Sequence, residues 1–240
     1  MKTLIALITF MVGSSVFAGS GSPFKSSVRG LSIPNSHVVT STNDAMVLRG
    51  MAPTAKQIEQ LKNLGVQEIL IFKNETKNEV QEEIADLQAA GFDKSAITNI
   101  AFPWKDIYNF KQACQMTVQA LRTIENASRA GRSIYFHCTV GEDRTGYLAG
   151  LWTLWSGKYK SIKQSFQEEM CARGYEAGDP TKPYKGVVMK IRETLTPTYL
   201  KMLAVLSDAK NRNLDLNESL CDQEPAMPFQ VSDFTCAPAM

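Results

Sequence analysis

The sequence predicts one α/β domain with a central, mostly parallel sheet flanked by helices. Short apolar runs of strand length alternate along the chain with longer segments whose apolar residues recur at helical spacing. The run at residues 133–136 is mostly apolar and bounded by polar residues, as is typical of a central strand covered on both faces. The composition, 44% hydrophobic and 21% charged over 240 residues, suits a single globular core.

The elements follow in order from about Met46, where we expect the folded unit to start. A segment resembling a capping box, Thr54 to Gln57, opens a helix that Gly65 ends. Strands are expected at residues 66–72 and 97–102, with a helix at 78–90 between them and a long helix at 110–130 before the central strand. Further helices are expected at residues 145–155, 162–172, 185–195 and 197–209; the first of these is apolar all round and too short to span a membrane.

The two ends of the chain are expected to lie outside this domain. Residues 1–18 contain Lys2, an apolar run and small residues up to Ala18, the layout of a secretory signal peptide cleaved after Ala18. A membrane anchor is the alternative, but the apolar run is short for a membrane span. Residues 19–45, rich in Ser, Gly and Asn, are expected to form a flexible leader, residues 46–210 the domain, and residues 211–240 a C-terminal tail.

The net charge of +2 falls to +1 when Lys2 leaves with the signal peptide. Such a weak overall field favours neither nucleic acid nor acidic membranes, so any preference for anions must come from a local site. We therefore expect no nucleic-acid partner, no membrane anchor after cleavage, and a periplasmic or secreted location.

Five cysteines remain after cleavage, so four can pair and one can stay free in an oxidising compartment. Cys221 and Cys236 are close in sequence, and we expect them to form a bridge that tethers the tail. Cys114 and Cys171 are equally compatible with buried, unpaired fillers on helices.

The chemistry is concentrated in residues 137–145, which we call the phosphate-binding loop. Cys138 ends the central strand, Gly141 permits a tight turn, and Arg144 opens the next helix. Successive backbone N–H groups and the helix dipole would then face one anion and favour the Cys138 thiolate. Arg144 offers a planar fork for two phosphoryl oxygens, and Thr145 can donate its hydroxyl to the sulfur. The other loop residues are His137, Thr139, Val140, Gly141, Glu142 and Asp143.

Each of these residues alone could be structural. The pattern His-Cys, five residues, Arg and Ser or Thr with its glycine arises by chance on the order of once in ten thousand chains of this size. A zinc site is the weaker alternative, because only His37 and His137 exist and no paired metal-ligand spacing accompanies them. The chemistry thus predicts no metal and no cofactor.

This loop resembles the signature loop of the protein tyrosine phosphatase superfamily. Leu48-Arg49-Gly50 with Pro53 is similar to the opening motif of its bacterial and atypical dual-specificity branches, and the likeness covers about residues 46–200. The 46–210 unit would then be a phosphatase domain.

The resemblance implies a role for each residue of the motif. Cys138 would be the nucleophile that forms a phosphocysteine intermediate, and Arg144 the phosphate ligand. Thr145 would assist breakdown of the intermediate or stabilise the thiolate, and His137 would buttress the loop.

The family also uses an upstream aspartate as general acid, commonly within Trp-Pro-Asp. Here the corresponding region reads Phe102-Pro103-Trp104-Lys105-Asp106, a permuted version, and Asp106 is the expected acid. Asp93 and Asp143 are poorer candidates, because Asp143 lies inside the loop itself.

The substrate expectation also comes from resemblance. The superfamily includes exported bacterial tyrosine-phosphatase-like phytases, which makes inositol polyphosphates the leading substrate. The usual phytase loop has an acidic residue directly after the cysteine, whereas this chain has Thr139, and Glu142 argues mildly against a phosphoinositide lipid. Cations for a polyanion could come from Lys73, Lys77, Lys105, Lys182 or Lys185.

Two alternatives stay open. A phosphotyrosine or dual-specificity phosphatase acting on phosphoproteins would need an aromatic slot, for which Trp104 or Tyr108 is available. A phosphate-binding module without catalysis would be expected to lack Cys138, Arg144 or the acid.

Overall fold

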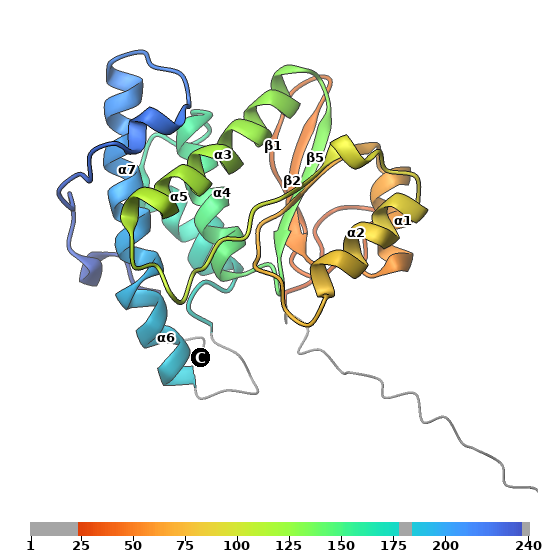
Figure 1. Cartoon of the computed structure of the whole chain (residues 1–240), viewed down its shortest axis with the longest axis horizontal. Helices are drawn as coiled ribbons and strands as arrows, with labels where there is room; N and C mark the ends of the chain where they lie inside the picture. Colours follow the sequence, from red (N-terminus) through yellow and green to blue (C-terminus); the bar gives the residue numbers. More distant parts are fainter. Residues whose placement is uncertain (1–23, 178–183, 237–240) are drawn as a thin grey trace, which may run out of the picture.

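The structure, a computed structural model, describes residues 24–177 and 184–236 and is built around a five-stranded sheet (Figure 1). The strand order is β1-β2-β5-β3-β4; β1 is antiparallel to β2, and the remaining neighbours are parallel. The predicted α/β class with a mostly parallel sheet is confirmed. The strands are β1 (His37–Ser41), β2 (Met46–Met51), β3 (Val66–Ile71), β4 (Ile97–Asn99) and β5 (Ser133–Cys138).

Helices cover both faces of the sheet (Figure 1). Alternate residues of β3 show the division: Ile69 and Ile71 join the core cluster beneath α1 and α2, whereas Leu70 joins the cluster beneath α3, α4 and α7. The main helices are α1 (Ala55–Asn63), α2 (Glu79–Ala89), α3 (Phe110–Arg129), α4 (Asp143–Trp155), α6 (Tyr184–Glu193) and α7 (Leu195–Asn211). The expected capping box opens α1, with the Thr54 N–H donating to Gln57 Oε1 at 2.9 Å.

The helix expected at residues 162–172 is present, but it is not one regular α-helix. The segment consists of α5 (Ile162–Ser165), a π-helical turn η2 (Phe166–Met170) and a 3₁₀ turn η3 (Cys171–Arg173). The carbonyl of Glu169 in the π turn accepts a hydrogen bond from the Arg49 guanidinium. A widened turn releases a carbonyl from the helical ladder, so this interruption serves a long-range contact.

The strand expected at residues 97–102 is shorter than predicted. β4 ends at Asn99, whose side-chain amide donates to the carbonyls of Ile71 and Lys73 at 3.0 and 3.1 Å. The Asn99 side chain thus binds carbonyls at and just beyond the end of β3, and the chain then turns into the loop that contains Pro103.

The flexible leader and the start at Met46 need correction. The signal peptide and cleavage site predicted at residues 1–18 lie outside the described residues, but residues 24–45 of the predicted leader are part of the folded domain. β1 pairs with β2, and Leu31 and Ile33 are buried in the cluster beneath α1 and α2. Isolated apolar residues in a polar segment show no periodicity, which is why the sequence did not reveal them.

The predicted Cys221–Cys236 bridge is wrong, as is the alternative of unpaired Cys114 and Cys171. The disulfides are Cys114–Cys221 and Cys171–Cys236. Each tail cysteine is therefore bonded to a cysteine of the domain. The tail itself contains two short 3₁₀ turns, η4 (Glu218–Cys221) and η5 (Val231–Asp233). The expectation of four paired cysteines and one free cysteine is confirmed, and the free one is Cys138.

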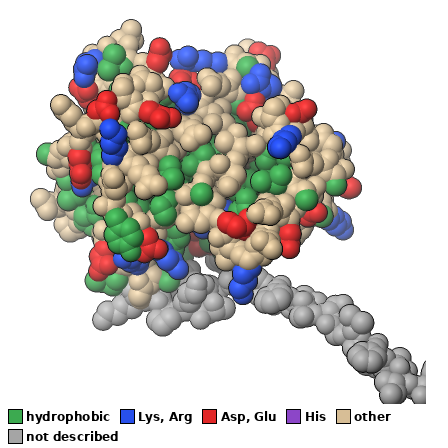
Figure 2. All heavy atoms as spheres, viewed as in Figure 1, with side chains coloured by type: hydrophobic (Ala, Val, Ile, Leu, Met, Phe, Trp, Pro, Cys, Tyr) green, Lys and Arg blue, Asp and Glu red, His purple; other side chains and the backbone are tan. Residues whose placement is uncertain are grey.

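Acidic and basic side chains are interspersed on the face shown in Figure 2, as the small net charge suggests. Within the described residues, no helix has the length and apolar character to cross a membrane.

Candidate active site

The phosphate-binding loop leaves the carboxyl end of β5 and enters α4 at Asp143. Gly141 turns with φ +75°, and a Cβ there would lie 2.5 Å from the carbonyl carbon and oxygen of Gly50 and 2.6 Å from the Met51 nitrogen. The loop therefore packs directly on the backbone of β2, and only glycine fits the contact.

Arg49 holds the loop from behind. Its fully buried guanidinium donates from Nη2 to the Gly141 carbonyl at 2.7 Å and from Nη1 to the Glu169 carbonyl. The Asn35 side-chain amide donates to the same Gly141 carbonyl at 2.9 Å. In a trans peptide the C=O and the N–H point in opposite directions. Because the Gly141 carbonyl points toward Arg49, the N–H of Glu142 in the same peptide points away from Arg49.

The Arg49 guanidinium sits in a buried charge cluster. Burial lowers its pKa to about 10, against the opposing charge of Glu169, so it remains cationic at neutral pH. Burial alone would raise the pKa of Glu169, but the hydrogen bond from His37 at 2.8 Å and the charges of Arg49 and Lys158 bring it down to about 2. Burial lowers the pKa of His37 to about 4, so a neutral imidazole donates to Glu169.

The structure pairs Cys138 with Thr145 and Arg144 with Thr139. The Cys138 N–H donates to the Thr145 hydroxyl at 2.9 Å, which leaves the hydroxyl proton free for another acceptor. Arg144 Nη2 donates to the Thr139 hydroxyl at 3.2 Å. Cys138 as a whole residue is 2% exposed.

His137 is fully buried and links Cys138 to α2. Its Nδ1 lies 3.0 Å from the Cys138 carbonyl oxygen, and its Nε2 lies 2.8 Å from Glu83 Oε1. The Lys73 ammonium is 3.1 Å from the other carboxylate oxygen of Glu83. Burial by itself raises the pKa of Glu83, but His137 and Lys73 outweigh it and hold that pKa below its usual range.

Lys73 is thus not a candidate for substrate binding, contrary to the suggestion from the sequence, because it is buried in this ion pair. The role of Glu83 as the partner of His137 was not predicted, although its position in the sequence offered one indication. Glu83 lies on the same helical stripe as Val80 and Leu87, where an acidic residue is out of place unless it has a buried partner.

Asp106, the predicted acid, lies in the loop between β4 and α3, at the same edge of the sheet as the phosphate-binding loop. Its exposed carboxylate accepts a hydrogen bond from the Tyr108 hydroxyl at 3.2 Å. Over the described ranges, it makes no hydrogen bond with residues 137–145. The Thr194 hydroxyl oxygen lies 2.8 Å from the Trp104 carbonyl oxygen and 2.7 Å from that of Lys190, so its one proton is shared between this loop and α6.

The two acidic loop residues contact the segment at residues 171–177. Glu142 is buried, and a Cβ on Gly174 would lie 2.8 Å from its side-chain carbons. Asp143 Oδ1 accepts the Glu176 N–H at 3.0 Å, and burial raises the pKa of Asp143 to about 6. Val140, the remaining predicted loop residue, lies in the turn between β5 and α4. Glu142 and Asp143 therefore brace the loop against this segment.

The other supporting residues, Asn35, Glu169 and Glu176, were not predicted, because no local pattern in the sequence marks them. Among the described residues, no three His, Cys, Asp or Glu side chains are grouped as metal ligands would be. The two histidines of the zinc alternative have separate partners: His37 contacts Glu169, and His137 contacts Glu83.

Comparison with known proteins adds a family assignment. The model of the tyrosine phosphatase family matches residues 40–158, which run from β1 through the phosphate-binding loop to the end of α4. No curated protein matched the chain.

Solved structures with a similar fold share little sequence with the chain. PTPMT1 has a TM-score of 0.49 and 13% identity, with 74% of this chain and 99% of that chain covered. The core catalytic domain of the PP-IP phosphatase SIW14 from S. cerevisiae has a TM-score of 0.44 and 20% identity, covering 57% and 74%. TpbA from P. aeruginosa has a TM-score of 0.40 and 20% identity, covering 60% and 84%. The family match thus assigns residues 40–158, which include the phosphate-binding loop, to the tyrosine phosphatase family.

Proposed function

We propose that this phosphatase hydrolyses phosphate monoesters through a cysteine nucleophile, Cys138. The observation that carries the proposal is the position of the one free cysteine. Cys138 lies at the carboxyl end of β5. A short turn follows it and leads into α4, which starts at Asp143. A phosphate bound there meets the N-terminus of α4 and the Arg144 guanidinium.

The reaction has two steps. The Cys138 thiolate attacks phosphorus, the bond to the ester oxygen breaks, and Asp106 gives that oxygen a proton. Water then attacks the phosphocysteine, Asp106 accepts its proton, and inorganic phosphate leaves. Arg144 follows the phosphoryl oxygens through both steps, and the Thr145 hydroxyl stabilises the departing sulfur.

Asp106 must approach the phosphate-binding loop for this chemistry. Its loop is anchored through Trp104 to Thr194, while Asp106 itself is exposed. Closure over a bound substrate would bring its carboxyl to the leaving group. The positive potential comes from Arg144, the loop amides and the helix terminus, so we propose that the reaction needs no metal.

Inositol polyphosphates are the proposed substrate class. Lys77 and Lys105 are exposed in the loops after β3 and β4, at the edge of the sheet where the phosphate-binding loop lies. Asp143 accepts the Glu176 N–H, which offsets part of its repulsion of a polyanion. A free inositol phosphate carries several phosphates and can engage both lysines while one phosphate occupies the loop.

A phosphotyrosine protein is the second candidate. Tyr108 is 91% exposed beside Asp106 and could stack on an aromatic substrate ring at the site entrance.

We also propose that the protein works in the periplasm or outside the cell. Two disulfides link the tail to the domain, and such bonds persist in oxidising compartments. The apolar run near the N-terminus supports export by a signal peptide.

The test follows phosphate release by residues 19–240 from inositol hexakisphosphate and from a phosphotyrosine peptide, with chelator present. Cys138→Ser should abolish release, and Asp106→Asn should lower kcat by roughly 10²–10⁴-fold. Replacing Lys77 and Lys105 with Ala should raise KM for inositol hexakisphosphate and leave turnover of p-nitrophenyl phosphate unchanged.

Each outcome separates the candidates. Preference for the peptide, with sensitivity to Tyr108→Ala, would replace the inositol phosphate proposal by the phosphotyrosine one. Full activity of Cys138→Ser would refute the cysteine mechanism, and loss of activity with chelator would refute metal independence.

A further inference from the structure

The segment at residues 171–177 supports three consecutive residues of the phosphate-binding loop. Asn35 donates both to the Gly141 carbonyl and to the Arg173 carbonyl, each at 2.9 Å. Gly174 packs against Glu142, and the Glu176 N–H donates to the Asp143 carboxylate at 3.0 Å. Movement of this segment would therefore move the loop.

Glu176 is the most constrained residue of the segment. It is 1% exposed and has φ +63°, a left-handed conformation that is uncommon outside glycine. Such a backbone persists only when its surroundings hold it. The conformation matters because the same residue aims its N–H at Asp143.

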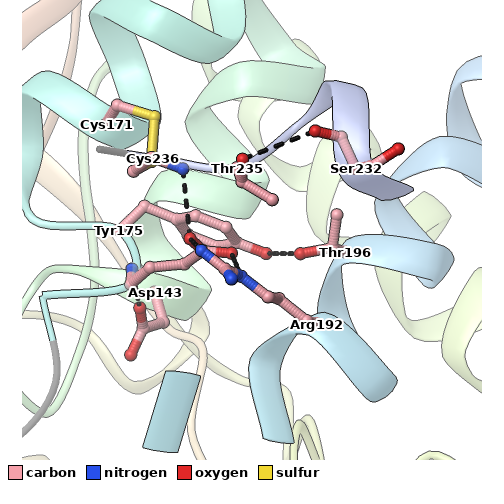
Figure 3. Close-up of a disulfide and its surroundings, with 9 residues drawn as sticks. Asp143, Cys171, Tyr175, Arg192, Thr196, Ser232, Thr235 and Cys236 are labelled. Carbon is pink, nitrogen blue, oxygen red and sulfur yellow. Dashed lines mark hydrogen bonds and ion pairs between the residues drawn. A yellow bond between two sulfur atoms is a disulfide. The ribbon is translucent and has the colours of Figure 1, made fainter. Parts of the chain in front are cut away.

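The Glu176 side chain provides that hold. Its two carboxylate oxygens accept from Arg192 Nε and Nη2 at 3.0 and 2.8 Å, and Oε2 also accepts the Cys236 N–H at 3.1 Å. Arg192 lies on α6, and Cys236 is near the end of the described tail. Figure 3 shows Arg192, Cys236 and Asp143 gathered around Tyr175.

The Cys171–Cys236 disulfide places Cys236 at Glu176. Cys171 begins the segment, and the bond brings the tail back against it (Figure 3). Phe234 supports this return by packing edge-on against Phe166, with ring centroids 5.2 Å apart. A covalent link in the tail is thus two hydrogen bonds away from Asp143, the neighbour of Arg144.

We propose that Glu176 is a positioning residue of the phosphate-binding loop and that the Cys171–Cys236 disulfide holds it in place, so that anion affinity depends on the C-terminal tail. The proposal deepens the proposed function, on which it rests for its effect on turnover. The N–H groups of the loop bind an anion well only when they are aligned, and small displacements are costly in such sites.

Anion binding can be measured without turnover. All five cysteines lie in the described residues and Cys138 alone is free, so iodoacetamide labels a single native thiol. The concentration of inorganic phosphate that halves the labelling rate reports the affinity of the site. Two double variants are compared. One carries Cys171→Ser and Cys236→Ser, and the other carries Cys114→Ser and Cys221→Ser, so each lacks one disulfide.

The second pair is a matched control. It also releases the tail from a disulfide, but between α3 and η4, and it opens a longer loop, with a sequence separation of 107 against 65. Chain entropy therefore predicts at least as much loss of stability in the control. An effect confined to the Cys171 and Cys236 pair cannot come from general destabilisation.

We expect loss of the Cys171–Cys236 bond to raise the half-protecting phosphate concentration roughly tenfold, equivalent to about 1.4 kcal/mol. The control should change less than twofold. Glu176→Ala should reproduce the shift, with Glu176→Gln recovering part of it because the amide oxygen still accepts the Cys236 N–H. If the double-serine chain fails to fold, the two Glu176 variants carry the test.

Equal shifts in both double variants, or none in Glu176→Ala, would overturn the proposal, as would a wild-type chain that phosphate does not protect. Phosphate protection without hydrolysis of any ester would refute the proposed function and leave this comparison intact.

Discussion

Replacing Gly141 with alanine tests the close contact between the phosphate-binding loop and β2. The new methyl group would sit 2.5 Å from the Gly50 carbonyl and 2.6 Å from the Met51 nitrogen. These are backbone atoms of a strand paired on both sides, so they cannot rotate away as a flexible side chain could. The loop must therefore lift, or β2 must shift.

The size of the effect follows from two contributions. An alanine at φ +75° costs about 1–2 kcal/mol in backbone strain. Overpacking in a tight contact adds about 1–3 kcal/mol. The expected destabilisation is therefore about 2–5 kcal/mol, a large part of the roughly 5–15 kcal/mol that holds a domain folded. Lifting the loop should also lower kcat/KM by about 100-fold or more.

Gly65→Ala is the control. Gly65 has φ +85° but no atom within 4 Å of an added Cβ, so only the backbone strain applies. Urea unfolding of both variants measures the difference, and phosphate release measures the effect on the site. If Gly141→Ala costs no more stability than Gly65→Ala and keeps its activity, the close contact does not shape this loop.

Three other substitutions probe the buried charges. Arg49→Met removes the cation beside Glu169, and a broken buried pair typically costs about 3–5 kcal/mol in unfolding free energy; an unchanged urea midpoint would contradict this role. Glu83→Gln leaves the Lys73 ammonium without its carboxylate, so thermal unfolding should occur at lower temperature, whereas an exposed Glu79→Gln should have little effect. Asp143 has a folded pKa of about 6, raised by burial above the ordinary 3.8, so its contribution to stability falls as pH rises from about 4 to about 6. Asp143→Asn should therefore gain stability relative to wild type between pH 4 and pH 7, and a difference independent of pH would argue against a raised Asp143 pKa.

The sequence predicted those elements whose signal is local. The helices at residues 110–130 and 145–155 and the central strand appear nearly as expected, because a periodic apolar face and its end signals lie within one segment. The irregular form of the helix at residues 162–172 was not predicted, for the opposite reason. Its interruption serves a contact between Glu169 and Arg49, 120 residues away in the chain, which no local window contains.

The same distinction applies to the candidate site. Cys138, Gly141, Arg144 and Thr145 were predicted because binding one anion requires particular residue types at fixed spacing on one turn. The groups behind that turn need only present a donor or an acceptor at the right point. An amide from Asn35, a guanidinium from Arg49 and a backbone N–H from Glu176 all meet that need, so their identity carries no recognisable pattern.

The disulfides show why distance along the chain is a poor guide to such contacts. Cys221 and Cys236 lie only fifteen residues apart, which suggested that they pair. Closing loops of 65 or 107 residues instead costs only about 1–2 kcal/mol more, since the entropy of closure grows with the logarithm of length. Burial of one aromatic side chain such as Phe234 against Phe166 contributes a similar amount. The packing of the tail on the domain therefore decides the pairing, and it brings Cys236 to the residue that braces the phosphate-binding loop.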